Sequence, residues 1–239
     1  MKKLILLTLI LVGCANQEST GLKPTPNFDN KIVAFGDSHT YGTSGQQLSW
    51  PDQVTKALGM LRTGINYSSQ MNTWFYLDNQ AMGSTKFDSP HQHGRMMSYA
   101  FKSSDTVVMM LGFNDVVFNG LDPAKLENFK TLLDEALTKI ETQTKKVFVG
   151  NCIKVPISTY DFMTQNGIEA GVDISHGSRE ACDVYAQAVR DVVALHPSST
   201  LVDTNANFDM TENDFADHVH FKFGKHLEIA NLFIAAINK

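Results

Sequence analysis

Residues 31–42 read Lys-Ile-Val-Ala-Phe-Gly-Asp-Ser-His-Thr-Tyr-Gly. The apolar run before Gly36 is rich in β-formers and stops at Gly36-Asp37-Ser38, which predicts a buried strand that ends in a tight turn. In an open parallel sheet, ligands bind in the crevice at the carboxyl ends of the strands. Ser38 is therefore a candidate nucleophile. The alternative is a turn without catalytic function, because these three residue types are common in turns.

Further apolar runs alternate with amphipathic segments along the rest of the chain. The second strand is either Ile65-Asn66-Tyr67 or Trp74-Phe75-Tyr76-Leu77, and we favour the latter because a turn of small residues follows it. Strands are expected at 31–36, 74–77, 106–111, 146–150 and 200–203, and helices at 50–61, 91–102, 122–140, 178–195 and 224–238. The segment 153–176 is expected to be a loop that walls the site.

This alternation predicts an α/β fold. The unbroken apolar run at 106–111 is typical of a central parallel strand that is covered on both faces. We expect a three-layer α/β/α sandwich, flavodoxin-like, around a central five-stranded parallel sheet.

The composition limits the partners of the chain. With 239 residues, of which 43% are hydrophobic, the chain can bury one good core. The net charge of -5 and the lack of a basic block argue against nucleic acid as a partner. The sequence has neither a G-x-G-x-x-G nor a Walker lysine pattern, and no G-x-S-x-G.

The N-terminus has the features of an export signal. Lys2 and Lys3 precede an apolar run, residues 4–12, that is too short to span a bilayer. The run ends in Leu11-Val12-Gly13-Cys14, which resembles a bacterial lipobox and implies cleavage before Cys14 and lipid attachment to it. An ordinary signal peptide is the alternative.

We therefore divide the chain into a signal peptide (1–13), a lipidated cysteine with a flexible polar tether (14–30), and one domain (31–239). Ala15 after Cys14 implies sorting to the outer membrane if the host has one. The expected location is the bacterial cell envelope, where a lipid anchor holds the domain, as a monomer, at a membrane. In this oxidising compartment Cys152 and Cys182 are either bridged or two buried thiols, and the sequence leaves both open.

The segment Asp217-His218-Val219-His220 contains a candidate general base. An aspartate three residues before a histidine can hold the imidazole by its Nδ1–H and leave Nε2 free to accept a proton. His218 competes with His220 for this role. The spacing from Asp217 favours His220.

Four separated motifs resemble those of the SGNH (GDSL-type) hydrolase family. They are Gly36-Asp37-Ser38, Gly83, Gly112-Phe113-Asn114-Asp115, and Asp217 with His220. The second motif is loose, since a glycine among small residues is common. His39 stands where the family name has leucine, and we expect it to be a rim or packing residue.

The resemblance implies a serine esterase that acts on a small acyl or acetyl ester, for example on a carbohydrate. Ser38 would attack the carbonyl, His220 would transfer the proton, and Asp217 would orient His220. The oxyanion would be held by the backbone N–H groups of Ser38 and Gly83 and by the Asn114 amide. This chemistry needs no metal and no organic cofactor.

Three alternatives remain. The same residues could transfer the acyl group to a hydroxyl of an envelope glycan instead of water. The chain could also be a non-catalytic, ligand-binding lipoprotein, although a binding protein has no physical need for all of these groups. Finally, His91/His93 and His218/His220 form two His-x-His pairs that could share a metal, but an exposed polar loop explains the first pair, and we expect no metal site.

Overall fold

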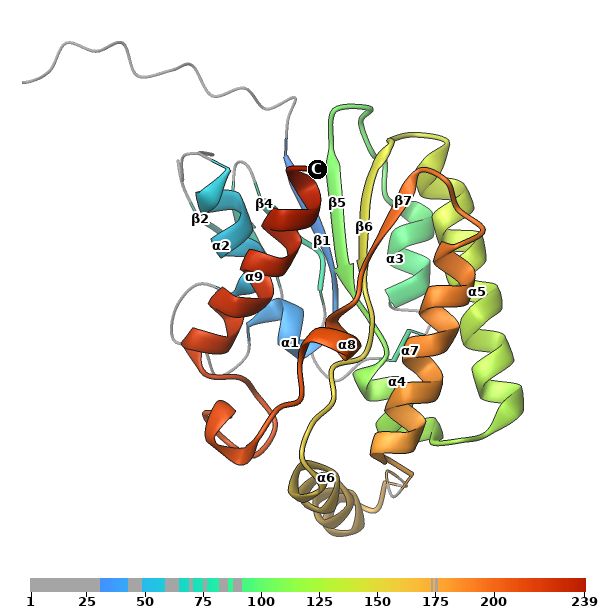
Figure 1. Ribbon diagram of the computed structural model, residues 1–239, viewed down its shortest axis with the longest axis vertical. Helices are drawn as coiled ribbons and strands as arrows, with labels where there is room; N and C mark the ends of the chain where they lie inside the picture. Colours follow the sequence, from blue (N-terminus) through green and yellow to red (C-terminus); the bar gives the residue numbers. More distant parts are fainter. Residues whose placement is uncertain are drawn as a thin grey trace, which may run out of the picture.

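The computed structural model describes residues 31–42, 49–58, 65–68, 71–74, 77–81, 86–87, 92–172, 174 and 176–239. The predictions for residues 1–30, Gly83 and His91 lie outside the described residues. The described residues form a three-layer α/β/α sandwich, with one sheet between two layers of helices (Figure 1). The predicted fold class is confirmed.

Five parallel strands form the centre of the sheet. Their order is β4 (Leu77–Asn79), β1 (Ile32–Gly36), β5 (Thr106–Met110), β6 (Lys146–Gly150) and β7 (Ser199–Val202). Counted along the chain, this is the 2-1-3-4-5 order of flavodoxin-like folds. Every residue of β1 and β5 is buried, because helices cover both faces of a parallel sheet.

Two antiparallel strands, β2 (Ile65–Ser68) and β3 (Met71–Trp74), extend the sheet beyond β4. Both candidates for the second predicted strand thus contribute to the sheet. The preferred candidate is only partly right, because the parallel strand begins at Leu77, where that run ends. The other candidate lies in the antiparallel edge strand β2.

The helices α2 (Trp50–Ala57) and α9 (Phe223–Ile237) cover one face of the sheet, and α3 (Gln92–Ser98), α5 (Pro123–Glu141) and α7 (Arg179–Val193) cover the other (Figure 1). These five helices confirm the predicted ones to within a few residues. Local chemistry explains two of the starts: Asp122 and Ser178 accept backbone N–H groups of the first turns of α5 and α7. The part of the chain that the structure describes holds no helix long and apolar enough to cross a membrane.

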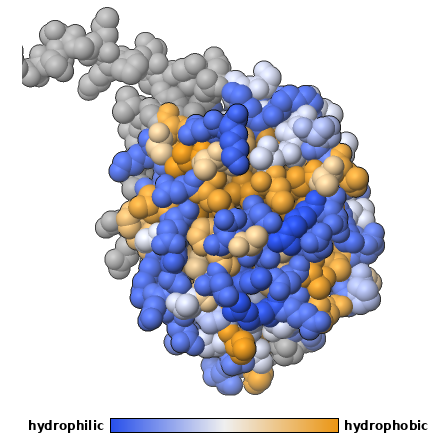
Figure 2. All heavy atoms as spheres, viewed as in Figure 1, coloured by the Kyte–Doolittle hydropathy of each residue, from blue (hydrophilic) through white to orange (hydrophobic). Residues whose placement is uncertain are grey.

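The prediction of a loop at 153–176 is wrong, because α6 (Ile157–Ala170) lies there. Its apolar side chains Ile157, Phe162 and Ile168 are exposed, so the sequence shows no buried stripe of helical spacing. Figure 2 shows hydrophobic residues on the surface at the lower end of the molecule, where α6 lies. Pro156 precedes the first turn, and Gly171 ends the helix with a φ of 67°.

The carboxyl ends of the parallel strands all lie at the lower end of the sheet in Figure 1. The chain leaves β1 into α1 (Ser38–Tyr41), β5 into α4 (Phe113–Asn119), and β7 into α8 (Thr204–Asn207). The 3-10 helix η1 (Glu212–Asp214) follows α8 and leads to the loop before α9. The first, third and fourth motifs, which are widely separated in the sequence, therefore lie at the same end of the sheet.

Candidate active site

Ser38 is the first residue of α1 and follows β1 directly. Asp37 caps this short helix: its Oδ1 accepts the His39 N–H at 2.9 Å, and its carbonyl accepts the Tyr41 N–H at 2.9 Å. Gly42 ends the helix with a φ of 87°. The predicted turn is thus a strand-to-helix turn, and it holds Ser38, 7% exposed, at the carboxyl end of β1.

Gly36 makes this turn sterically allowed. Its φ is 153°, and a Cβ at this position would meet the Met110 carbonyl oxygen of β5 at 2.7 Å and would also collide with the Thr40 side chain. The glycine of the first motif therefore has a local structural reason.

The Asp217–His220 loop forms a compact hydrogen-bonded unit. Asp217 Oδ2 lies 2.8 Å from His220 Nδ1, and Asp217 Oδ1 accepts the N–H groups of Val219 at 2.8 Å and His220 at 2.6 Å. Burial raises the pKa of Asp217, but the hydrogen bonds from His220 and Val219 outweigh it and hold this pKa below its usual value. Because a carboxylate accepts, His220 donates through Nδ1–H and its Nε2 remains available.

The first and fourth motifs are linked through His39. Its Nε2 lies 2.9 Å from the Val219 carbonyl oxygen, and its ring centroid lies 6.0 Å from that of His220. Since Ser38 and His39 are neighbours in the chain, this contact joins the nucleophile helix to the loop that carries His220. His39 is 3% exposed, so the expectation of a packing residue is correct and that of a rim residue is wrong.

Burial controls the charges around Ser38. It raises the pKa of Asp37 to about 6, against the lowering effect of the His39 N–H and the nearby His220. Burial, together with the smaller effect of the neighbouring His220, also lowers the pKa of His39 to about 3. His39 is therefore neutral at pH 7.

Asn114 and Asp115 lie in the first turn of α4 rather than in a turn between elements. Gly112 caps this helix with a φ of 105°, and Asn114 is 4% exposed. Both Asp115 carboxylate oxygens accept the Phe87 N–H, at 3.1 and 2.9 Å. The third motif thus anchors the segment that follows the Gly83 region, an interaction that the sequence pattern did not indicate.

The histidines considered for a metal have other neighbours. The His218 ring stacks on Phe162 of α6, with centroids 4.5 Å apart, and His93 Nε2 lies 3.3 Å from a Glu135 carboxylate oxygen between α3 and α5. Among the residues that the structure describes, no group of three His, Cys, Asp or Glu side chains is arranged to hold a metal ion.

A small hollow of about 30 Å³ opens beside Asp217. Ser158, Thr159, Glu212, Phe215 and His218 complete its lining, and the Ser158 hydroxyl donates to Glu212 at 3.0 Å. The walls therefore present hydroxyl, carboxylate and imidazole groups next to an aromatic ring.

The two cysteines of the domain are neighbours in space. Cys152 follows β6 and Cys182 lies in the first turns of α7; both are fully buried thiols, with Sγ atoms 2.6 Å apart. Burial and the neighbouring Cys182 raise the pKa of the Cys152 thiol.

Comparison with known proteins places the chain in a family. Residues 34–222 match the family described as GDSL-like Lipase/Acylhydrolase. No curated protein sequence matches the chain.

Solved structures are similar in fold. A variant of Axe2, an acetylxylan esterase from Geobacillus stearothermophilus, is 17% identical, with a TM-score of 0.60 over 87% of this chain and 94% of that one. LAE5, an alpha/beta hydrolase enzyme from the metagenome of Lake Arreo in Spain, is 22% identical, with a TM-score of 0.59 over 87% and 95%.

Proposed function

Since the chain belongs to the GDSL-like lipase/acylhydrolase family and is thus an ester hydrolase of the SGNH type, we propose that it hydrolyses a small acyl ester. Ser38 is the nucleophile, His220 is the general base, and Asp217 orients His220.

One observation carries this assignment. Asp217 Oδ2 accepts from His220 Nδ1 at 2.8 Å, which sets the tautomer in which Nε2 can take a proton. The loop that contains this pair is hydrogen-bonded to the residue next to Ser38. A base with a fixed tautomer, on a loop that is hydrogen-bonded to the chain neighbour of a buried serine, is an arrangement suited to acyl transfer.

The reaction then follows in two steps. Ser38 Oγ attacks the ester carbonyl while His220 Nε2 takes the hydroxyl proton, and His220 returns this proton to the departing alcohol. Water attacks the acyl-enzyme in the same way and releases the acid. Asp217 stabilises the imidazolium that forms in both steps, and it does not itself take the proton.

The tetrahedral intermediates carry a negative oxygen. The backbone N–H groups of Ser38 and Gly83 and the side-chain amide of Asn114 donate to it. Asn114 is suited to this task because its amide is buried at the carboxyl end of β5, next in the sheet to the strand that precedes Ser38.

The substrate class is an acetyl ester on a carbohydrate. The polar side chains around the small hollow beside Asp217 support this choice, because their hydroxyl, carboxylate and imidazole groups can hydrogen-bond to sugar hydroxyls at the surface. The two carboxylates disfavour an anionic headgroup. Axe2, which has a similar fold, is an acetylxylan esterase and thus acts on an acetyl ester of a carbohydrate.

The test is hydrolysis of p-nitrophenyl acetate by the full chain. Ser38→Ala and His220→Ala should each lower kcat by about 10³-fold or more. His93→Ala is the control, since it removes a histidine that pairs with Glu135 between α3 and α5, outside the proposed site, and it should lower kcat less than tenfold. Equal turnover by wild type and Ser38→Ala would overturn the assignment. Faster turnover of p-nitrophenyl octanoate than of the acetate would overturn the short-acyl specificity.

We further propose that Cys14 is lipidated and anchors the domain in the bacterial cell envelope. The support is the sequence Leu11-Val12-Gly13-Cys14 after a basic and apolar start. Cells that express the chain with a palmitate label should yield a labelled protein in the membrane fraction. Cys14→Ala should abolish the label, and a label retained by this variant would contradict the proposal.

A further inference from the structure

His39 lies between the two parts of the proposed site, and it is 180 residues away in sequence from the group that it binds. We infer that His39 is a positioning residue that holds the Asp217–His220 loop, and with it the base, against the nucleophile helix. The inference rests on the proposed roles of Ser38 and His220.

The hydrogen bond of His39 has a defined direction. A carbonyl oxygen only accepts, so the contact of 2.9 Å with Val219 requires a proton on His39 Nε2. Both partners are buried, with His39 3% and Val219 7% exposed. If His39 were replaced by a residue with no donor, the buried Val219 carbonyl would lose this hydrogen bond. The loss would raise the free energy of the loop in its present position.

Aromatic rings fix the orientation of His39. Phe221, the residue after His220, stacks on it with centroids 4.3 Å apart and an interplanar angle of 28°. The ring of Phe113 in α4 also contacts it, with centroids 4.6 Å apart and an interplanar angle of 49°. The imidazole is thus held between the third motif and the fourth, and its Nε2–H points at the residue before His220.

In the part of the chain that the structure describes, the other hydrogen bonds of residues 216–220 lie within this segment. Asp217 binds the N–H groups of Val219 and His220, the Ala216 N–H donates to the His220 carbonyl at 2.8 Å, and the Lys222 N–H donates to the Asp214 carbonyl at 2.8 Å. These bonds set the shape of the loop. The His39 bond sets its position relative to Ser38.

Two substitutions separate the hydrogen bond from the packing. His39→Leu keeps an apolar group of similar size but removes the donor, and it should lower kcat for p-nitrophenyl acetate about 10- to 100-fold with a smaller change in KM. His39→Gln places an amide N–H within reach of Val219 and should restore most of kcat. The acid limb of the kcat–pH profile should shift in His39→Leu and return in His39→Gln, because the environment of His220 changes with the loop.

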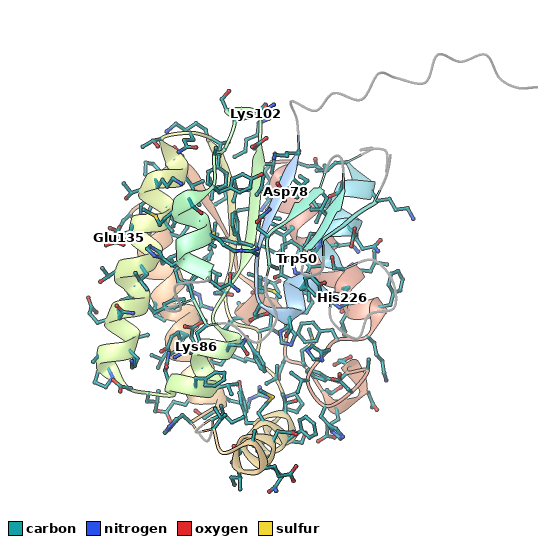
Figure 3. All side chains as sticks on the ribbon, turned by 180° about the vertical axis from the view of Figure 1, so that it is seen from behind. Trp50, Asp78, Lys86, Lys102, Glu135 and His226 are labelled. Carbon is teal, nitrogen blue, oxygen red and sulfur yellow. The ribbon has the colours of Figure 1, made fainter. Side chains whose placement is uncertain are left out.

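His226 provides the matched control. His226 lies in α9, in the helix layer that also contains Trp50 of α2 (Figure 3). It is 1% exposed, and its ring centroid lies 5.9 Å from that of Phe221. Neither of its ring nitrogens has a hydrogen-bond partner among the described residues. His226→Leu therefore changes a buried histidine beside the same phenylalanine without touching the loop. It should keep kcat within about threefold and leave the pH profile unchanged.

The outcomes are distinct. Wild-type kcat and pH profile in His39→Leu would overturn the inference, and so would equal losses in His39→Leu and His39→Gln. If His39→Leu does not fold, His39→Met takes its place, since methionine is similar in size to glutamine but has no donor for the Val219 carbonyl. A positioning role then predicts a lower kcat and a shifted acid limb in His39→Met but not in His39→Gln. A failure of the proposed function is recognised separately, because wild type and Ser38→Ala would then be equally inactive.

The buried cysteine pair carries a second, independent inference. We propose that Cys152 and Cys182 are a site of disulfide formation, because their sulfur atoms already lie 2.6 Å apart and need only a small shift to bond. The bridge would close the segment 153–181, which contains α6. It would also brace Gly112, where a Cβ would lie 3.5 Å from the Cys152 Cβ, and so the start of the helix that carries Asn114.

The step is an oxidation. Two S–H bonds break and one S–S bond forms, while a disulfide such as oxidised glutathione accepts the two electrons and two protons and becomes two thiols. Because both sulfurs are buried, the bond would form most readily while the chain folds, before α6 covers them.

The test uses the full chain, refolded with oxidised glutathione and digested without reductant. A single peptide pair that joins Cys152 to Cys182, with a mass two hydrogens below the thiol form, is expected. Dithiothreitol should then lower Tm by about 5–15 °C, and it should not do so in the Cys152→Ala/Cys182→Ala double variant. Recovery of both residues as alkylated thiols after this treatment would overturn the proposal.

Discussion

The two halves of the candidate site are held in different ways. Ser38 and its neighbours Asp37 and His39 are at most 7% exposed and lie at the end of a fully buried strand. The side chains of Asp217 and His220 are 46% and 21% exposed and belong to a loop. Ser38, the proposed nucleophile, is placed by the fold. His220, the proposed base, is placed by local hydrogen bonds and by the contact of its loop with His39.

This difference predicts where each half is sensitive. Changes around Ser38 should cost stability as well as activity, since they disturb the core. Changes in the Asp217–His220 loop should cost activity with little effect on stability, because exposed groups contribute little to folding. The following substitutions test this contrast.

The largest effect is expected for Asp217→Asn. The amide can present an N–H to His220 Nδ1, which favours the tautomer whose Nε2 carries the proton and cannot accept another. We expect kcat to fall about 10³- to 10⁴-fold and Tm to change little. Asp214→Asn is the control, because Asp214 binds Thr211 and Lys225 rather than His220, and it should keep kcat within about threefold. Equal losses of kcat in both variants would show that turnover depends on the structure of the whole loop and not on the Asp217–His220 hydrogen bond.

On the buried side, Asn114→Ala removes the proposed side-chain donor to the oxyanion. We expect kcat to fall about 10²- to 10³-fold with a nearly unchanged KM, because the donor acts on the transition state. Steady-state kinetics with p-nitrophenyl acetate measure both constants. A rise in KM at constant kcat would assign Asn114 to substrate binding instead.

Gly36→Ala tests the strand-to-helix turn. A Cβ at this position would collide with Thr40 and approach the Met110 carbonyl oxygen to 2.7 Å, so the free energy of unfolding should fall by about 2–3 kcal/mol. Gly171→Ala is the control, since Gly171 also has a positive φ, 67°, but a Cβ there meets nothing within 4 Å. Its cost should be about 1 kcal/mol. Urea unfolding measures both, and equal costs would contradict the steric account.

The smallest effect concerns pH and the buried groups between the two halves. Burial lowers the pKa of His39 to about 3 and of His226 to about 4, against about 6.5 in the unfolded chain. As the pH falls below 6.5, the two histidines bind protons in the unfolded chain but not yet in the folded chain. The folded state therefore loses stability as the pH falls. Asp37 acts oppositely, because burial raises its pKa to about 6 and its protonation below pH 6 stabilises the fold.

Between pH 6 and pH 4, His39 and His226 each lower the free energy of unfolding as the pH falls, and Asp37 raises it. The net effect of these three groups is a loss of about 1.4 kcal/mol for each unit by which the pH falls. In His226→Leu the slope should become smaller by about 1.4 kcal/mol per pH unit, whereas the contributions of carboxyl groups such as Asp214 and Asp217, whose pKa values lie below their usual range, remain. Urea unfolding at pH 6, 5 and 4 measures it. A wild-type slope of zero, or one that His226→Leu leaves intact, would contradict the assigned protonation states.

Much of the fold could be predicted because its signals are local. Apolar runs of β-formers mark the parallel strands, and Asp122 and Ser178 mark the starts of two helices. The hydrogen bond between Asp217 and His220 is predictable for the same reason, since a spacing of three residues brings both side chains to one side of a tight loop.

The interactions that the sequence did not reveal are those between distant segments. His39 and Val219 are hydrogen-bonded across 180 residues, and Asp115 and Phe87 across 28, without a pattern in either neighbourhood. The helix α6 was missed because its apolar side chains face outward, so it lacks the periodicity by which a buried helix is recognised.

The central claim is that Ser38 is a nucleophile activated by His220, and covalent labelling tests it most directly. The full chain is treated with p-nitrophenyl ethylphosphonate, which traps a nucleophilic serine as a stable phosphonate ester, and is then digested and analysed by mass spectrometry. We predict one adduct per chain, on the peptide that contains Ser38, formed at least about 10²-fold more slowly in His220→Ala. An adduct on another residue, or an active chain that takes up no phosphonate, would contradict the account.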